Sequence, residues 1–182
     1  DEARKFPRTS GNGWDFRGWA LEVPGIGEAK VVELIDGAGT VGLVLVDSTY
    51  APASPEMVEE VLANVMAKKP IGATPTVEAA ASLEITIAAT VTVQSISLDE
   101  VKRELETGLT EYLKTLIETK YGRIYYGPDE DLPYTLVYNR VLAILLNIKG
   151  VENFSALTVN GGEKDISIPA DSIPVLQEVV VT

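Results

Sequence analysis

The chain has 182 residues, a formal net charge of -12 at pH 7, and neither cysteine nor histidine. These absences exclude disulfides, thiol nucleophiles, cysteine-type zinc sites and every histidine-based catalytic or metal site. The negative charge opposes binding to DNA or RNA, because nucleic-acid affinity comes largely from lysine and arginine at the phosphates.

An apolar content of 46% with 23% charged residues is typical of a folded globular chain. The longest apolar runs, such as Val141–Leu146, are far shorter than the roughly 20 residues that a membrane-spanning helix needs. We therefore expect no membrane insertion. Because the sequence begins at Asp1 and not at methionine, we also expect it to be a piece of a longer protein.

Residues 1–22 predict an extended N-terminal arm, since charges, glycines and two tryptophans follow one another there without a helical or strand period. Residues 23–81 predict a first module of type ββαβ, with one face of its sheet packed and the other available. Its hairpin turn is 36–39, and Ser54 is the expected N-cap of its helix. The expected elements are strands Ala29–Ile35 and Thr40–Val46, a helix that starts at Pro55 and is closed by residues 68–70, and strand Thr74–Ala81.

Residues 82–182 predict a second module of type βααβββ. Strict alternation of apolar and polar residues makes 83–93 the clearest strand, and Ser97 with Glu100 forms a capping box for a long helix after it. A second helix is expected from Tyr134 to Ile148. Three strands then follow, the first two joined as a hairpin: Val151–Val159, Asp165–Ile168 and Val175–Val181. The fold class predicted is α+β, with two small helix-on-sheet modules.

Asp129, Glu130 and Asp131 form the tightest acidic cluster of the sequence. Two carboxylates could serve glycoside chemistry or bind calcium, but the spacing fits neither pattern well. We favour a solvated loop whose charge suits the start of the following helix. Glycines at 25–27 and 37–39 lead into strands, so they predict turns and not phosphate-binding loops. We therefore predict no catalytic residues, no cofactor and no metal.

Two groups of aromatic residues are candidates for a protein interface. Trp14, Phe16 and Trp19 lie together in the arm, and Tyr125 and Tyr126 lie between the two expected helices. Either group could simply complete a local core. Where such rings stay partly exposed, they often anchor contacts between proteins.

The segment 11–31 resembles the baseplate J-like family of phage tail proteins, of the phage Mu or PBSX type, and its most specific part is Trp19–Gly27. The resemblance continues through most of the chain. It includes 37–47, 53–56, 70–73, 150–151, 157–161 and 173–176.

The resemblance implies a non-catalytic wedge component of a contractile-tail baseplate, which contacts copies of itself and other baseplate proteins. Its expected location is the virion, after assembly in the bacterial cytoplasm. The open edges of strands 74–81 and 175–181 could accept a partner strand. An alternative function is a carbohydrate-binding or cell-wall-lytic module that uses the acidic loop with Tyr125 and Tyr126.

Overall fold

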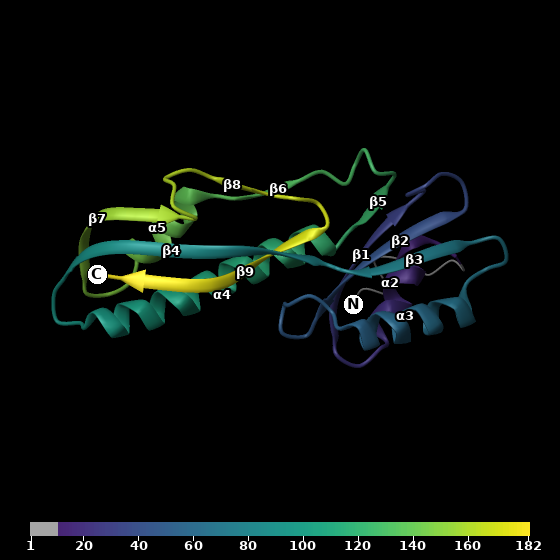
Figure 1. Ribbon diagram of the computed structural model, residues 1–182, viewed down its shortest axis with the longest axis horizontal. Helices are drawn as coiled ribbons and strands as arrows, with labels where there is room; N and C mark the ends of the chain where they lie inside the picture. The colour runs from purple at the N-terminus through teal and green to yellow at the C-terminus, as the bar shows by residue number, and fades with distance from the viewer. Residues whose placement is uncertain (1–10) are drawn as a thin grey trace. The chain divides into compact units, whose positions relative to one another are not determined.

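The computed structural model describes residues 11–182, and the chain divides into two compact units (Figure 1). Both units are built from stretches that are far apart in the sequence. The first holds the described residues up to Ser82, with Glu118–Leu132 and Ala170–Ile173. The second holds Leu83–Ile117, Pro133–Pro169 and Pro174–Thr182. Helices and mixed sheets occur in both, which confirms the α+β class.

Helix α2, Gly13–Leu21, occupies most of the described part of the segment 1–22, for which an extended arm was expected. The prediction of an extended arm is therefore wrong for Gly13–Leu21. Residues 1–10 lie outside the described part of the chain. The helix begins at Asn12, whose side chain accepts a hydrogen bond from the Asp15 amide at 3.0 Å. The Asp15 carboxylate accepts from the Gly11 and Asn12 amides in return. This capping box satisfies amide groups that the first helical turn leaves unpaired.

The first unit contains the predicted ββαβ elements in the predicted order. Strands β1 (Ile26–Glu33) and β2 (Thr40–Asp47) pair antiparallel, so the hairpin is confirmed. Helix α3 (Pro55–Lys68) starts at Ser54, whose hydroxyl accepts from the Met57 amide. Strand β3 (Thr74–Ala79) then runs parallel to β2.

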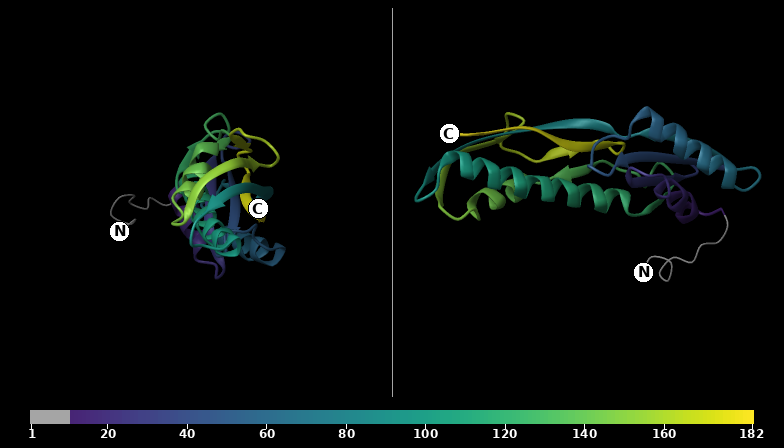
Figure 2. Two further views of the ribbon diagram at one scale, coloured as in Figure 1. Left: turned by 90° about the vertical axis from the view of Figure 1, so that its left-hand side faces the viewer. Right: turned by 90° about the horizontal axis from the view of Figure 1, so that it is seen from below.

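Helices α2 and α3 pack against each other and build a core with one face of this sheet (Figure 2). The opposite face was expected to be available, but it is buried as well: Lys30, Val32, Val44 and Val46 are at most 4% exposed. The same unit includes 118–132, and strand β5 (Ile124–Tyr126) from that segment pairs with β1. The sheet order is β3-β2-β1-β5, and sequence reasoning missed β5 because it has only three residues.

The second unit is built on a sheet of three strands. Strand β4 (Ala81–Val93) alternates buried and exposed side chains from Ile85 to Thr90, as its sequence predicts. Helix α4 (Leu98–Tyr121) begins with the predicted capping box, in which Ser97 and Glu100 bond each other's backbone amides. The other members of the sheet are β7 (Val151–Val159) and β9 (Ser172–Val181), and the order is β7-β4-β9.

The segment 134–168 differs from the prediction. Tyr134–Leu136 forms strand β6, and helix α5 begins only at Tyr138 and ends at Leu146. The expected hairpin between the strands at 151–159 and 165–168 is also wrong. Strand β7 pairs with β4, whereas β8 (Ile166–Ile168) pairs with β6. The turn at Asn160–Gly162 therefore joins strands of two different sheets.

Candidate functional site

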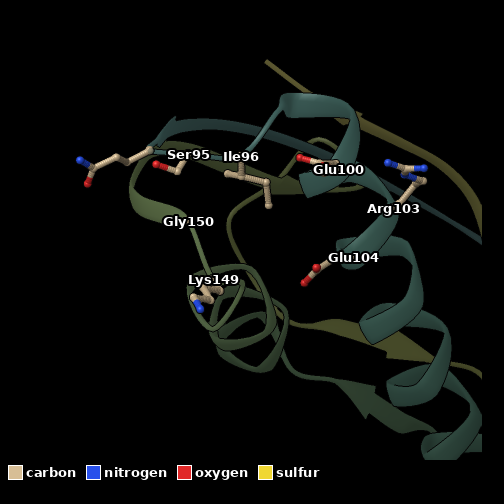
Figure 3. Close-up of a pocket in the computed structure, with 8 residues that line it drawn as sticks. Ser95, Ile96, Glu100, Arg103, Glu104, Lys149 and Gly150 are labelled. Atoms are coloured by element: carbon tan, nitrogen blue, oxygen red, sulfur yellow. The ribbon is translucent and has the colours of Figure 1, made fainter.

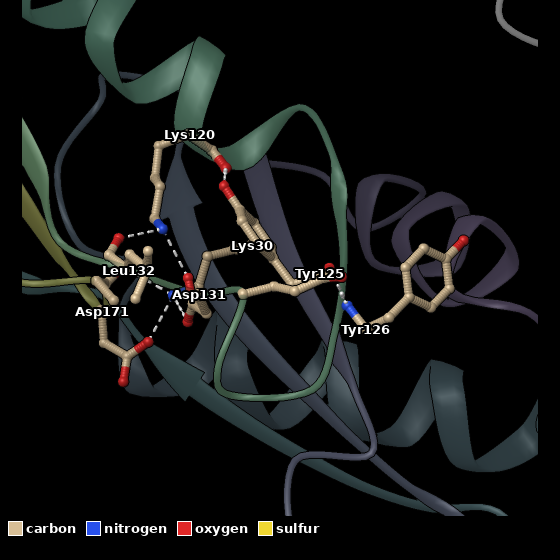
Figure 4. Close-up of polar contacts among 9 residues, drawn as sticks. Lys30, Lys120, Tyr125, Tyr126, Asp131, Leu132 and Asp171 are labelled. Atoms are coloured by element: carbon tan, nitrogen blue, oxygen red, sulfur yellow. Dashed lines mark hydrogen bonds and ion pairs between the residues drawn. The ribbon is translucent and has the colours of Figure 1, made fainter.

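Asp131, which was expected in a solvated loop, is instead part of a buried ion cluster in the first unit (Figure 4). Its Oδ2 lies 2.7 Å from the Nζ of Lys30, and its Oδ1 lies 2.7 Å from the Nζ of Lys120. Its side chain is 7% exposed. Both carboxylate oxygens thus face ammonium groups, so Asp131 is the buried counter-ion of two lysines.

Lys30 is the centre of this cluster, and its side chain has no exposed surface. Besides Asp131, its ammonium group donates to Asp171 Oδ1 at 2.5 Å and to the Ala170 carbonyl at 2.7 Å. Strand β1 is therefore joined to two segments more than 100 residues away in sequence. A buried ammonium group is costly to desolvate, so charge-assisted hydrogen bonds of this kind must offset that cost.

Lys120 completes the cluster by donating to the Leu132 carbonyl at 2.6 Å. Burial lowers the pKa of Lys120, and the nearby Asp131 carboxylate opposes that shift. The backbone carbonyl of Lys120 accepts a hydrogen bond from the Tyr125 hydroxyl at 2.6 Å. Burial raises the pKa of Tyr125 to about 12, so this phenol keeps its proton at neutral pH.

The remaining two acids of the triplet, Asp129 and Glu130, lie in the exposed part of the loop. Glu130 accepts a hydrogen bond from the Tyr126 amide at 2.9 Å. Acid-base hydrolysis of a glycoside needs two carboxylates that flank the bond to be broken. Both oxygens of Asp131 already face ammonium groups, one of Lys30 and one of Lys120.

Two of the predicted interface aromatics belong to the core of the first unit. Phe16 has no exposed surface and meets Trp19 edge to face, with 5.1 Å between the ring centroids. Tyr125 is 3% exposed and bonded to Lys120. Because buried rings cannot meet a partner in the folded chain, the interface prediction is corrected for Phe16 and Tyr125.

The other aromatic candidates keep accessible surface. Trp14 and Trp19 are half-buried, and the Arg17 guanidinium lies 6.0 Å from the Trp14 ring centroid. Tyr126 is 59% exposed at the end of β5. It pairs with Glu33 in the parallel register of β1 and β5, which places it near Leu34, a residue that is 50% exposed. The sequence does not identify Leu34 as exposed, because it lies within the apolar run of the expected strand Ala29–Ile35.

A pocket of about 580 Å³ opens in the second unit, where the loop before α4 meets the turn after α5 (Figure 3). Its charged lining consists of Glu100, Arg103, Glu104 and Lys149. Hydrogen bonds from Ser97 lower the pKa of Glu100. The mixture of charges with apolar Ile96 suits a contact with a polar protein surface. Sequence patterns do not reveal it, because its two walls come from distant segments.

Within residues 11–182, no group of three or more acidic side chains is arranged to hold a metal ion. None of the helices described is both long enough and apolar enough to cross a membrane.

Two family models match most of the chain, one after the other. Residues 8–79 match the family described as the Baseplate J-like central domain. Residues 85–182 match the one described as the Baseplate J-like protein C-terminal domain. The boundary between the two matches falls at 79–85, where β3 gives way to β4.

Two proteins of Bacillus subtilis strain 168 are similar in sequence. "Phage-like element PBSX protein XkdT" is 31% identical over 181 residues, which cover 94% of this chain and 48% of that protein. "Uncharacterized protein YqbT" is 30% identical over 191 residues, which cover 97% of this chain and 51% of that protein. The chain thus spans about half the length of these curated relatives.

The fold resembles a chain in the cryo-EM structure of the anti-feeding prophage baseplate, symmetrised six-fold. The TM-score is 0.61 at 13% identity, over 97% of this chain and 39% of that one. This likeness concerns the fold, while the two family matches confirm the sequence resemblance seen around Trp19–Gly27. The chain belongs to the baseplate J-like family.

Proposed function

We propose that this chain is a structural part of the baseplate of a contractile phage tail or a related phage-like particle, and that it acts by docking to other proteins. The observation that carries the proposal is the pair of baseplate J-like matches, which together extend over most of the sequence. The names of XkdT, a protein of a phage-like element, and of the anti-feeding prophage baseplate support the same kind of particle.

The proposed role involves no catalysis. The chain contains no histidine or cysteine, and Asp131 is engaged by Lys30 and Lys120. A nucleophilic serine or threonine would need a neighbouring base, and the acidic loop supplies only the exposed Asp129 and Glu130. These features support docking over the lytic or carbohydrate-binding alternative.

The proposed partners are other baseplate proteins and further copies of this chain. Assembly would take place in the host cytoplasm, and the finished tail would be the protein's final location. A net charge of -12 disfavours stray binding to DNA during that process. Tyr126, Leu34 and the pocket beside Lys149 are accessible surfaces suited to such contacts.

Deletion of the complete gene, followed by complementation, tests this function. We expect deletion to abolish tailed particles in electron micrographs and the intact gene to restore them. A double variant, Asp129→Asn with Glu130→Gln, should restore them equally, because neither exposed carboxylate is needed for docking.

The same experiment separates the two functions when cell-wall degradation is measured alongside. Particles that form normally with the double variant but no longer degrade cell wall would favour the lytic alternative. Normal particles in the deletion strain would contradict the structural role itself.

A further inference from the structure

Strand β9 is an outer strand of its sheet, and one of its edges pairs with no other described strand. Thr182, which directly follows β9, donates its amide to the Ala89 carbonyl at 2.9 Å and accepts from the Val91 amide at 2.9 Å. The amide and the carbonyl of Thr182 thus bond to two residues of β4 that flank Thr90. This is the hydrogen-bond pattern of parallel strands. Successive residues of a strand direct their amide and carbonyl groups to opposite sides. The amide and carbonyl groups of Val181 and Val179 therefore point away from β4.

The outer strands β3, β5 and β7 each carry a feature that resists strand addition. In β3 the Thr74 amide bonds the Gly39 carbonyl, so the outward position falls on Pro75, which has no amide hydrogen. Strand β5 has three residues only. The pairing of β7 with β4 contains two register shifts. Strand β9 has ten residues, and its one proline, Pro174, lies outside Val179–Thr182.

A cavity of about 360 Å³ lies beside this edge, within the second unit. Lys102, Glu106 and Thr110 line it from one face of α4, and Leu176–Val179 line it from β9. A strand added to β9 would direct alternate side chains toward this cavity. Glu106 and Glu178 give the lining one more negative than positive charge, in a chain whose net charge is -12. Lysine or arginine at those alternate positions would complement it.

We propose that the free edge of β9 binds an extended strand of a partner protein that carries basic side chains at alternate positions. A second copy of this chain is a poor match, because β9 itself contains no lysine or arginine and each copy adds a charge of -12. The inference rests on the proposed docking function in one respect, which is that the partner is a protein.

A labelled, end-blocked synthetic octapeptide of alternating lysine and valine is the probe, and fluorescence anisotropy measures its binding to this chain. Val181→Pro removes the outward amide hydrogen while the amide and carbonyl of Thr182 keep their bonds to β4. We expect this variant to weaken binding by about tenfold, the effect of losing a backbone hydrogen bond. Val181→Thr, which keeps the amide, should bind as the parent does.

The Val181 pair separates strand addition from simple charge attraction, because both variants carry the same charge. A matched peptide with glutamate in place of lysine should not bind. Equal binding by the two Val181 variants, or by the two peptides, would overturn the proposal. So would a dimer of the chain that Val181→Pro dissociates, since the occupant would then be a second copy.

Circular dichroism of the Val181→Pro variant, together with amide exchange at Val91 and Thr182, establishes that β4 and β9 still pair. Failure of the peptide test alongside normal complementation by the intact gene would overturn the strand site and leave the baseplate assignment standing. If the peptide binds as expected but the intact gene fails to complement the deletion, the baseplate assignment would be overturned and the strand site would stand.

Discussion

Replacing Asp131 with alanine is expected to lower the free energy of unfolding by about 3 to 5 kcal/mol, the cost of removing one partner from a buried ion pair. The change leaves the ammonium groups of Lys30 and Lys120 without the carboxylate that lies between them. Lys30 keeps Asp171, but that side chain is 60% exposed and cannot replace a buried counter-ion. Urea unfolding of the parent and variant measures the difference.

Asp129→Ala is the matched control, because it removes the same group from an exposed position in the same loop. Its effect should stay within about 0.5 kcal/mol, as for most surface substitutions. Equal stability of the two variants would mean that the ion cluster contributes little, and Asp131 would again be a candidate for chemistry.

Replacing Phe16 with alanine is expected to cost about 3 to 5 kcal/mol of unfolding free energy, the range for a large side chain deleted from a core. Phe16 is fully buried in the core formed by α2, α3 and the first sheet, so the deletion leaves a cavity there. Thermal or urea unfolding of the purified chain measures the loss.

Tyr126→Ala separates core aromatics from surface aromatics. Since Tyr126 is 59% exposed, its removal should change stability by less than about 1 kcal/mol. A stable Phe16→Ala variant would show that α2 is only loosely attached to this unit, and would restore the arm expected from the sequence.

Local signals accounted for most of the regular elements. Ser54 before Pro55 marked the start of α3, the Ser97 and Glu100 capping box marked that of α4, and alternation over 83–93 gave β4. Each signal operates within a few residues, so it can be read without knowing the rest of the fold. Helix α2 had such a signal in Asn12 and Asp15, but the surrounding glycines and tryptophans obscured it.

Long-range features were not accessible in the same way. Lys30 and Asp131 are 101 residues apart, so no spacing rule connects them. The one available sign was a lysine inside the apolar run 29–32, where a charge must find a buried partner. The turn at Asn160–Gly162 was read as a hairpin because turn chemistry fixes a change of direction but not the strand that pairs next. Strand β5 likewise depends on β1 for its existence.

Quantitative mass spectrometry of purified particles tests the central claim most directly. Particles from a host that carries the complete gene should contain this protein in a fixed ratio to the tail tube and sheath proteins, and the ratio should survive repeated sedimentation. Recovery of intact tailed particles that lack the protein, or a ratio that falls with each wash, would contradict the account.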